Sequence, residues 1–409
     1  MTGALMSVDV ELARTAEVPP PRKSAWPRYE ADEIQAVAEV LGSGQVNSLH
    51  HGKMCRRFES EMAELCEMPH AIAVTNGTAA LELALNALGV GVGDEVIVPA
   101  RSFMASASCV VTCGASPIFA DVDRDSQNIT AETIEAVLSP RTRAVIVVHL
   151  AGWPCNMEPI VALAQKHGLL IIEDCAQAPG AFHNGRPTGS FGDAAGFSFC
   201  TDKIISTGGE GGMLLLRDRS AWKRAWALKD HGKDPDNYAA IVPGPDFLWL
   251  HDSVGSNYRM TEMQAAIGAA QLSKLPRWLA ARRANAAALE SELTGLKALR
   301  LAIPAQHTDH ARYKYCAFVR PEHLKAGWDR RRIIQETVSQ GLSCTAGSCP
   351  EIYREAAFTD YSLRPASRLP IAQELGETSI MLPVDHTLSQ EDMSVVGKRL
   401  RKIIELATA

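Results

Sequence analysis

Apolar and polar segments alternate along the first half of the chain in a pattern typical of an α/β fold. Seven short runs are apolar almost throughout, and segments with the apolar spacing of helices separate most of them. These runs occupy residues 71–74, 95–100, 117–122, 143–150, 169–174, 195–199 and 212–217. Strands that are buried on both faces have such continuous apolar sequences. The pattern therefore predicts a mostly parallel sheet of the seven-stranded type, with helices on both faces.

The second half of the chain has a more mixed pattern. Thr261 and Gln264 have the spacing of a capping box and predict the start of a helix. Further elements are expected as a long helix over 276–296, a strand near 313–319, a helix near 329–338 and an amphipathic helix over 390–405. With 409 residues, the chain exceeds what one hydrophobic core usually supports. We expect a flexible N-terminal arm, a large α/β domain and a small α+β domain, at residues 1–25, 26–255 and 256–409.

Composition excludes several classes of function. The net charge of −6 gives no basic surface for nucleic acid, and no apolar run is long enough to span a bilayer. The N-terminus contains acidic residues and lacks the basic start and apolar core of a signal peptide, so we expect a cytoplasmic protein. None of the ten cysteines forms a Cys-x-x-Cys pair, which favours buried free thiols over a metal site.

Residues suited to ligand binding stand at the ends of four of the predicted strands, at the sheet edge where ligands of α/β proteins bind. Gly77 and Thr78 open a helix, whose free N–H groups and dipole favour a phosphate. Asp174 ends the strand at 169–174, where a carboxylate would keep the nitrogen of a pyridine ring protonated.

Two further positions complete this set. Ser198 and Lys203 flank the end of the strand at 195–199, and a partly desolvated lysine suits imine formation. Phe103 follows another strand and has a ring that would stack on a planar cofactor. Each residue also has an ordinary structural explanation: helix capping for Thr78, a cap or turn for Asp174, a solvated loop for Lys203 and core packing for Phe103.

In chain order, these candidates are a phosphate-binding helix start (Gly77 and Thr78), an aromatic ring (Phe103), Asp174 and Lys203. This ordered set resembles the DegT/DnrJ/EryC1/StrS family of sugar aminotransferases. This family belongs to fold type I of the pyridoxal phosphate (PLP) enzymes. The resemblance covers nearly the whole chain from about Pro27. It rests on the sequences NGTAALELAL (76–85), VPARSFMASA (98–107), IIEDCAQAPGA (171–181), SFCTDKIISTGGEGG (198–212) and GSNYRMTEMQAAIGAAQL (255–272).

The resemblance implies a role for each residue of the site. Lys203 is similar to the lysine that holds PLP covalently and later moves the proton. Asp174 is similar to the partner of the pyridine nitrogen, and Gln177 to the residue near the ring's 3-hydroxyl. The expected phosphate contacts are Gly77, Thr78 and Ser198.

Three other positions are also assigned by resemblance. Phe103 occupies the stacking position. Asn257 resembles a residue that reaches the cofactor phosphate of the neighbouring subunit, which implies a homodimer with shared active sites. Arg259 resembles a substrate or partner-site contact, although a structural salt bridge is an open alternative. No metal is implied.

The family's reaction moves an amino group from glutamate or glutamine to a keto-sugar, typically nucleotide-linked, for polysaccharide or antibiotic biosynthesis. An aminotransferase or dehydratase acting on a cyclitol or amino-shikimate-type ketone is one alternative. The sugar dehydratases of the family usually have His in place of the lysine, so Lys203 argues against that activity. A non-catalytic sensor is another alternative. Residues 49–52 (Leu-His-His-Gly) depart from the Thr-Gly pair of many relatives, which affects expected substrate contacts but not the PLP residues.

Overall fold

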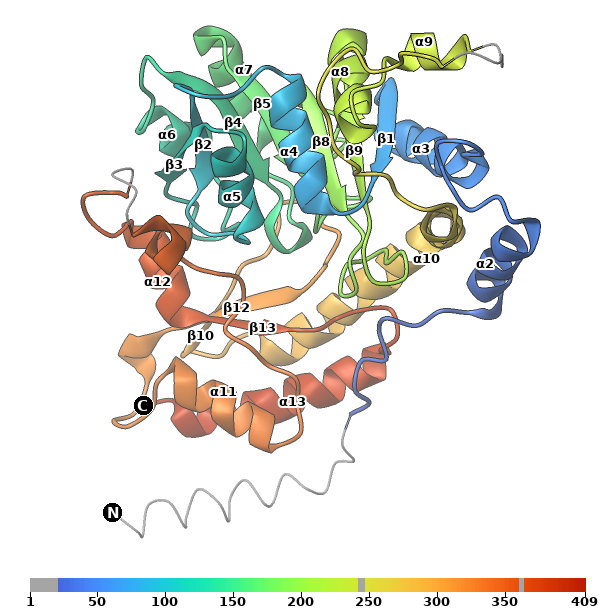
Figure 1. Cartoon of the computed structure of the whole chain (residues 1–409). Coiled ribbons are helices and arrows are strands. Elements are labelled where there is room, and N and C mark those ends of the chain that lie inside the picture. Colours follow the sequence, from blue (N-terminus) through green and yellow to red (C-terminus); the bar gives the residue numbers. More distant parts are fainter. Residues whose placement is uncertain (1–20, 242–246, 360–363) are drawn as a thin grey trace.

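The computed structural model describes residues 21–241, 247–359 and 364–409 (Figure 1). Most of the expected N-terminal arm, residues 1–20, lies outside the described residues. Residues 21–25 run along the C-terminal part of the chain, where the N–H of Arg22 donates to Asp392 and the N–H of Ala25 to Thr387. In the described part of the chain, no helix combines the length and apolar character needed to cross a membrane.

A seven-stranded sheet forms the centre of the larger part of the molecule. Its strand order is β1-β9-β8-β5-β4-β2-β3. Strand β9 is antiparallel to both of its neighbours, and the other pairs are parallel, which confirms the predicted sheet. The strands are β1 (His70–Val74), β2 (Glu95–Pro99), β3 (Ser116–Ala120), β4 (Thr142–Val148), β5 (Leu170–Asp174), β8 (Ala194–Ser198) and β9 (Gly212–Leu216).

Helices cover both faces of this sheet because its strands are apolar on both sides. Leu214 and Leu215 are neighbours in β9 and point into different core clusters. One face packs on α4 (Gly77–Ala87), α5 (Ala105–Thr112) and α8 (Arg219–Lys229). The other face packs on α3 (Lys53–Leu65), α6 (Ala131–Glu135), α7 (Met157–His167) and α10 (Glu262–Leu293).

Helix α10 corrects one expectation. Its predicted capping box is present, since the Thr261 hydroxyl accepts from the N–H of Gln264. However, the segments expected as two helices form a single helix of 32 residues that continues through Pro276. A proline inside a helix loses one hydrogen bond. Packing against α3, α2 (Ala31–Ser43) and α13 (Gln390–Ala407) along its length offsets that loss.

A second, three-stranded antiparallel sheet lies beyond α10, which extends from one sheet to the other (Figure 1). It contains β10 (Leu299–Leu301), β12 (Tyr315–Val319) and β13 (Ser379–Leu382), and it packs on α11 (Arg330–Ser339) and α13. The predicted strand near 313–319 and the helices near 329–338 and 390–405 are confirmed. Strand β13 and helix α12 (Pro370–Thr378) were not predicted.

Short elements complete the structure. A small sheet joins β6 (Phe182–His183) and β7 (Arg186–Pro187) to β11 (Thr308–Asp309). Helix α9 (Pro235–Ala239) lies between α8 and α10 and was not predicted. The division at residues 255 and 256 stays a prediction, because α10 packs against elements of both parts.

Gly268 generates a prediction about packing between α10 and α3. A Cβ at this position would lie 2.5 Å from Phe58 Cε1, and Phe58 is fully buried. Overpacking of this kind costs about 1–3 kcal/mol, more than the roughly 1 kcal/mol that alanine gains over glycine in a helix. Gly268→Ala should therefore lower the free energy of unfolding, measured by urea denaturation.

Gly42 in α2 provides the matched control, because no atom lies within 4 Å of a Cβ built there. Gly42→Ala should raise the free energy of unfolding by about 0.5–1 kcal/mol. A Gly268→Ala protein as stable as the wild type would show that Phe58 has room to move.

Candidate active site

The buried carboxylate of Asp174 lies at the end of β5, with 7% of the residue exposed. It accepts hydrogen bonds from the Ser106 hydroxyl at 2.9 Å and from the N–H of Ala176 at 3.1 Å. Burial raises the pKa of Asp174, while the two hydrogen bonds and the charge of Lys203 oppose the rise. A cationic ligand group would lower the pKa and favour the charged carboxylate.

Lys203 lies five residues beyond β8, in a loop that also contains Asp202. Its ammonium lies over the ring of Tyr313, 4.9 Å from the ring centre. The Tyr313 hydroxyl donates to the carboxylate of Asp202, which fixes the position of that ring. Within the described ranges, the Lys203 ammonium has no carboxylate or other hydrogen-bond acceptor. Its amine is therefore available for covalent chemistry.

The segment just after the expected N-terminal arm holds the Lys203 loop in place. The indole N–H of Trp26 donates to the backbone carbonyl of Lys203 at 2.7 Å. The Tyr29 and Ser206 hydroxyls are hydrogen-bonded at 3.1 Å. Sequence reasoning missed these contacts, since nothing in the local pattern connects residues that lie 177 positions apart.

The three expected phosphate contacts come together where α4 begins. Asn76 is the helix N-cap, and its side chain accepts from the N–H of Ala79. The N–H groups of Gly77 and Thr78 have no partner within the helix. A Cβ on Gly77 would lie 2.7 Å from the Cβ of Ser198, so only glycine allows this approach. This cradle of N–H and hydroxyl groups fits a phosphate, and capping by Thr78 is excluded.

Gln177 has a fixed orientation beside Asp174. Its side-chain oxygen accepts from the N–H of Ala151 at 2.6 Å, so its amide nitrogen remains as a donor.

The side chain of Phe103 is exposed. It is 67% accessible to solvent, which excludes core packing and leaves its ring free to stack. Together with Asp174 and Lys203, these groups fit a planar, phosphorylated pyridine.

Arg259 and Asn257 lie in a different setting. Arg259 forms an ion pair with the fully buried Asp230 at 2.5 Å. Burial opposes ionisation of Asp230, but the charges of Lys229, Arg259 and Lys233 lower its pKa overall. The structural salt bridge that was left open for Arg259 is therefore present. Asn257 is exposed, and its side chain accepts from the N–H of Arg259. Their expected ligand contacts stay predictions.

A buried network around Glu173, the residue before Asp174 in β5, is structural. His149, Glu173 and Cys175 offer potential metal ligands within 4.8 Å of one another. The Glu173 carboxylate already binds the His149 ring and three backbone N–H groups, of Gly189, Phe191 and Gly192. The other ring nitrogen of His149 accepts from the N–H of Cys155. These satisfied groups hold the loop at 189–192 in place.

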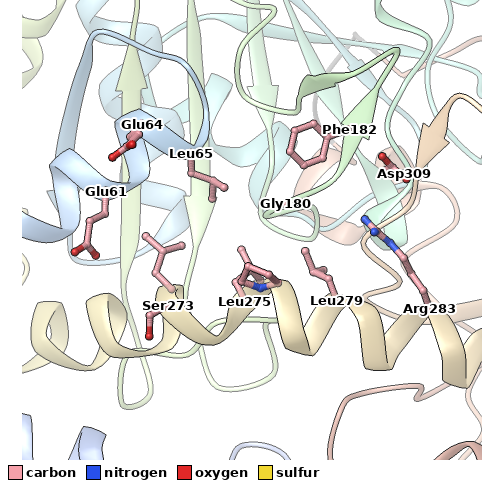
Figure 2. A pocket seen from close by; sticks show the side chains of 12 residues that line it. Glu61, Glu64, Leu65, Gly180, Phe182, Ser273, Leu275, Leu279, Arg283 and Asp309 are labelled. Carbon is pink, nitrogen blue, oxygen red and sulfur yellow. The ribbon is translucent and has the colours of Figure 1, made fainter.

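A cavity of about 560 Å³ lies elsewhere, between α3, the turn at Gly180 and one side of α10 (Figure 2). Leu275 and Leu279 point into it from α10, opposite Phe182. None of the expected site residues lines this cavity. It also lacks a lysine or other nucleophile suited to the expected chemistry, so we place the active site at the strand ends instead.

Comparison with known proteins agrees with this geometry. The profile of the DegT/DnrJ/EryC1/StrS aminotransferase family matches residues 27–401. The GDP-perosamine synthase of Caulobacter vibrioides is 37% identical, and the alignment covers 93% of this chain and 97% of that protein.

Two solved structures are also similar. An aminotransferase from Psychrobacter cryohalolentis has a TM-score of 0.91 and 45% identity, covering 94% of this chain and 100% of its own. The Streptococcus pneumoniae protein Spr1654, solved in its PLP form, has a TM-score of 0.84 and 25% identity, covering 94% and 99%. These neighbours confirm the expected fold type.

Asp174 generates a prediction about stability. Because burial raises its pKa, the charged carboxylate destabilises the folded, cofactor-free protein at neutral pH. Asp174→Asn should raise the thermal unfolding temperature of that form by a few degrees. The difference should shrink as the pH falls toward the ordinary aspartate pKa of about 4. Added PLP should stabilise the wild type more than the variant.

The exposed Asp309 is the control, and Asp309→Asn should change neither quantity. An Asp174→Asn protein that is less stable without cofactor, yet gains as much from PLP, would contradict the assigned role.

Proposed function

The chain belongs to the DegT/DnrJ/EryC1/StrS aminotransferase family and is a PLP-dependent aminotransferase. From this premise we propose that it transfers an amino group from glutamate or glutamine to a nucleotide-linked keto-sugar. The observation that carries this proposal is the unpaired Lys203 ammonium near a strand end. Its charge opposes the rise that burial causes in the pKa of the Asp174 carboxyl group. The name of the Caulobacter relative favours a sugar linked to a nucleoside diphosphate.

The residues around the site have distinct proposed tasks in holding the cofactor. The carboxylate of Asp174 pairs with the pyridine nitrogen, and the Gln177 amide donates to the ring's 3-hydroxyl. The N–H groups of Gly77 and Thr78, with the hydroxyl of Ser198, bind the phosphate. The exposed ring of Phe103 covers one face of the pyridine ring.

PLP, when bound, supplies an aldehyde carbon that accepts amino groups and a ring that withdraws electrons from the attached carbon. Lys203 holds the cofactor between reactions. When an incoming amine displaces it, its free Nζ acts as the base that takes a proton from the donor carbon. The same nitrogen later returns a proton to the sugar carbon. Tyr313 and Trp26 position the lysine for both steps.

A homodimer with shared sites is part of the proposal. Asn257 is exposed, and the segment before it carries the exposed side chains of Phe247, Trp249 and Val254. Apolar groups of this size favour burial against another protein surface. A second copy that covers them would bring Asn257 to the neighbouring cofactor phosphate. The expected cytoplasmic location also stays part of the proposal.

A non-catalytic sensor has no need for a free amine beside a buried carboxylate. The dehydratase alternative is likewise disfavoured by Lys203 itself. A cyclitol ketone would use the same residues, and the GDP-sugar relative favours the sugar.

Lys203 provides the direct test of function. Wild-type protein should show a near-visible absorbance band with PLP, and the band should fall when glutamate or glutamine is added. Lys203→Ala removes the nitrogen that holds the cofactor, so it should lack this band and lose transamination by at least about 10³-fold. The exposed Lys166 serves as control, and Lys166→Ala should behave as wild type.

Mixing variants tests the shared site. If Asn257 acts on the partner's cofactor, Lys203→Ala and Asn257→Ala chains complement each other, because each mixed dimer contains one native site. We expect Asn257→Ala to lose activity because its phosphate contact is lost in both sites, and random reassembly with Lys203→Ala should then bring activity to about a quarter of the wild-type value. A mixture of Lys203→Ala and Asp174→Asn should gain nothing, since both residues act within one chain. Equal results from the two mixtures would contradict the shared site.

A further inference from the structure

Lys314 lies beside Lys203, at the start of the second sheet. The two ammonium groups contact the same ring, because each Nζ lies 4.9 Å from the centre of Tyr313. They are therefore no further apart than twice that distance. Lys314 is partly buried and directly precedes β12, which fixes its backbone. A second amine thus belongs to the surroundings of the catalytic lysine.

The Lys314 ammonium has no anionic partner in the parts of the chain that the structure describes. The nearby carboxylate of Asp202 already accepts from the Tyr313 hydroxyl, and that of Asp385 from Thr387. Burial lowers the pKa of Lys314; the charges of Asp202 and Asp385 oppose this shift, and those of Arg282 and Lys203 add to it. A partly buried, unpaired charge is costly. For Lys203, the covalent bond to the cofactor explains why an unpaired amine is kept. Lys314 has no such role, so its charge is expected to be compensated by an anionic group of a ligand.

Backbone contacts place Lys314 on the Gln177 side of the site. The N–H of Lys314 donates to the carbonyl of Ala151, and the N–H of Ala151 donates to Gln177. The phosphate cradle is built separately, by the start of α4 and Ser198. The cofactor phosphate therefore has its own donors, and the anion that Lys314 binds comes from a substrate.

We propose that Lys314 binds the α-carboxylate of the amino donor. This inference rests on the proposed function. The α-carboxylate is bonded to the same carbon as the amino group that displaces Lys203, so it enters the space beside that lysine. The keto-sugar presents neutral hydroxyls there, and its diphosphate lies a whole sugar ring away from the reacting carbon. An ammonium acts as a point charge that suits a carboxylate.

Two small amines test the contact without knowledge of the sugar. Aminooxyacetate carries a carboxylate, and methoxyamine is a similar molecule without one. Each replaces the Lys203 nitrogen on the cofactor carbon and releases the lysine amine, and the loss of the near-visible band reports the rate. In wild-type holoenzyme the carboxylate-bearing probe should react faster. Lys314→Met should lower the ratio of the aminooxyacetate rate to the methoxyamine rate by about 10- to 100-fold, because only aminooxyacetate has a carboxylate for Lys314 to bind.

Matched variants separate charge from structure. Lys314→Arg should keep most of the preference because it keeps the charge, and Lys166→Met should keep all of it. A Lys314→Met holoenzyme with the wild-type preference would overturn the inference while leaving the proposed function intact. A wild-type protein without the near-visible band would overturn the proposed function, and this inference with it.

Natural donors identify which carboxylate is bound. The rates at which glutamate and glutamine remove the band should fall by similar factors in Lys314→Met, since both have an α-carboxylate. A loss confined to glutamate would assign the contact to the side-chain carboxylate and overturn the α assignment.

Discussion

The burial of one carboxylate at the end of an apolar strand is the constraint on which the rest of the site depends. Asp174 lies between strands whose cores are fully apolar, and its charge is supported there by the hydroxyl of Ser106, the N–H of Ala176 and the nearby charge of Lys203. These groups are insufficient, because burial still raises the pKa of the carboxyl group. The protein groups alone therefore compensate the Asp174 charge only in part, and a cationic pyridine ring would supply the rest. The buried charge of Asp174 therefore has two effects: it favours binding of the cationic cofactor, and it destabilises the folded protein when the cofactor is absent.

The lysine side of the site is assembled from three distant parts of the chain. The strand end supplies Lys203, the second sheet supplies the ring of Tyr313, and the N-terminal segment supplies the hydrogen bond from Trp26. Helix α10 extends between the two sheets and so fixes the distance between the first two parts (Figure 1). This arrangement leaves two amines unpaired around one ring. One is explained by the covalent chemistry of PLP, and the other, Lys314, accounts for recognition of an anionic substrate.

The sheet and most of the residues at its edge were predictable because their signals are local. An apolar run indicates a buried strand; Asp174 ends one such run, and Lys203 lies in the loop just beyond another. Trp26, Tyr313 and Lys314 carry no local signal, since their importance arises from contacts across the whole fold. The two helices expected after Thr261 and over 276–296 are one helix for the same reason: packing along α10 outweighs the local cost of Pro276. For Arg259, the sequence left a ligand contact and a structural salt bridge open; the ion pair with the buried Asp230 is present, and the ligand contact stays a prediction.

The contacts of Trp26 also bear on which parts of the chain the lysine loop needs. Trp26 precedes Lys203 by 177 positions, and its indole N–H donates to the Lys203 carbonyl. The ring of Trp26 in turn packs on Trp278 and His386, which both follow Lys203 in the sequence. Segments on both sides of the lysine therefore hold the side chain that fixes its carbonyl. A fragment that contains Lys203 but ends before residue 278 keeps the reactive amine and loses this support.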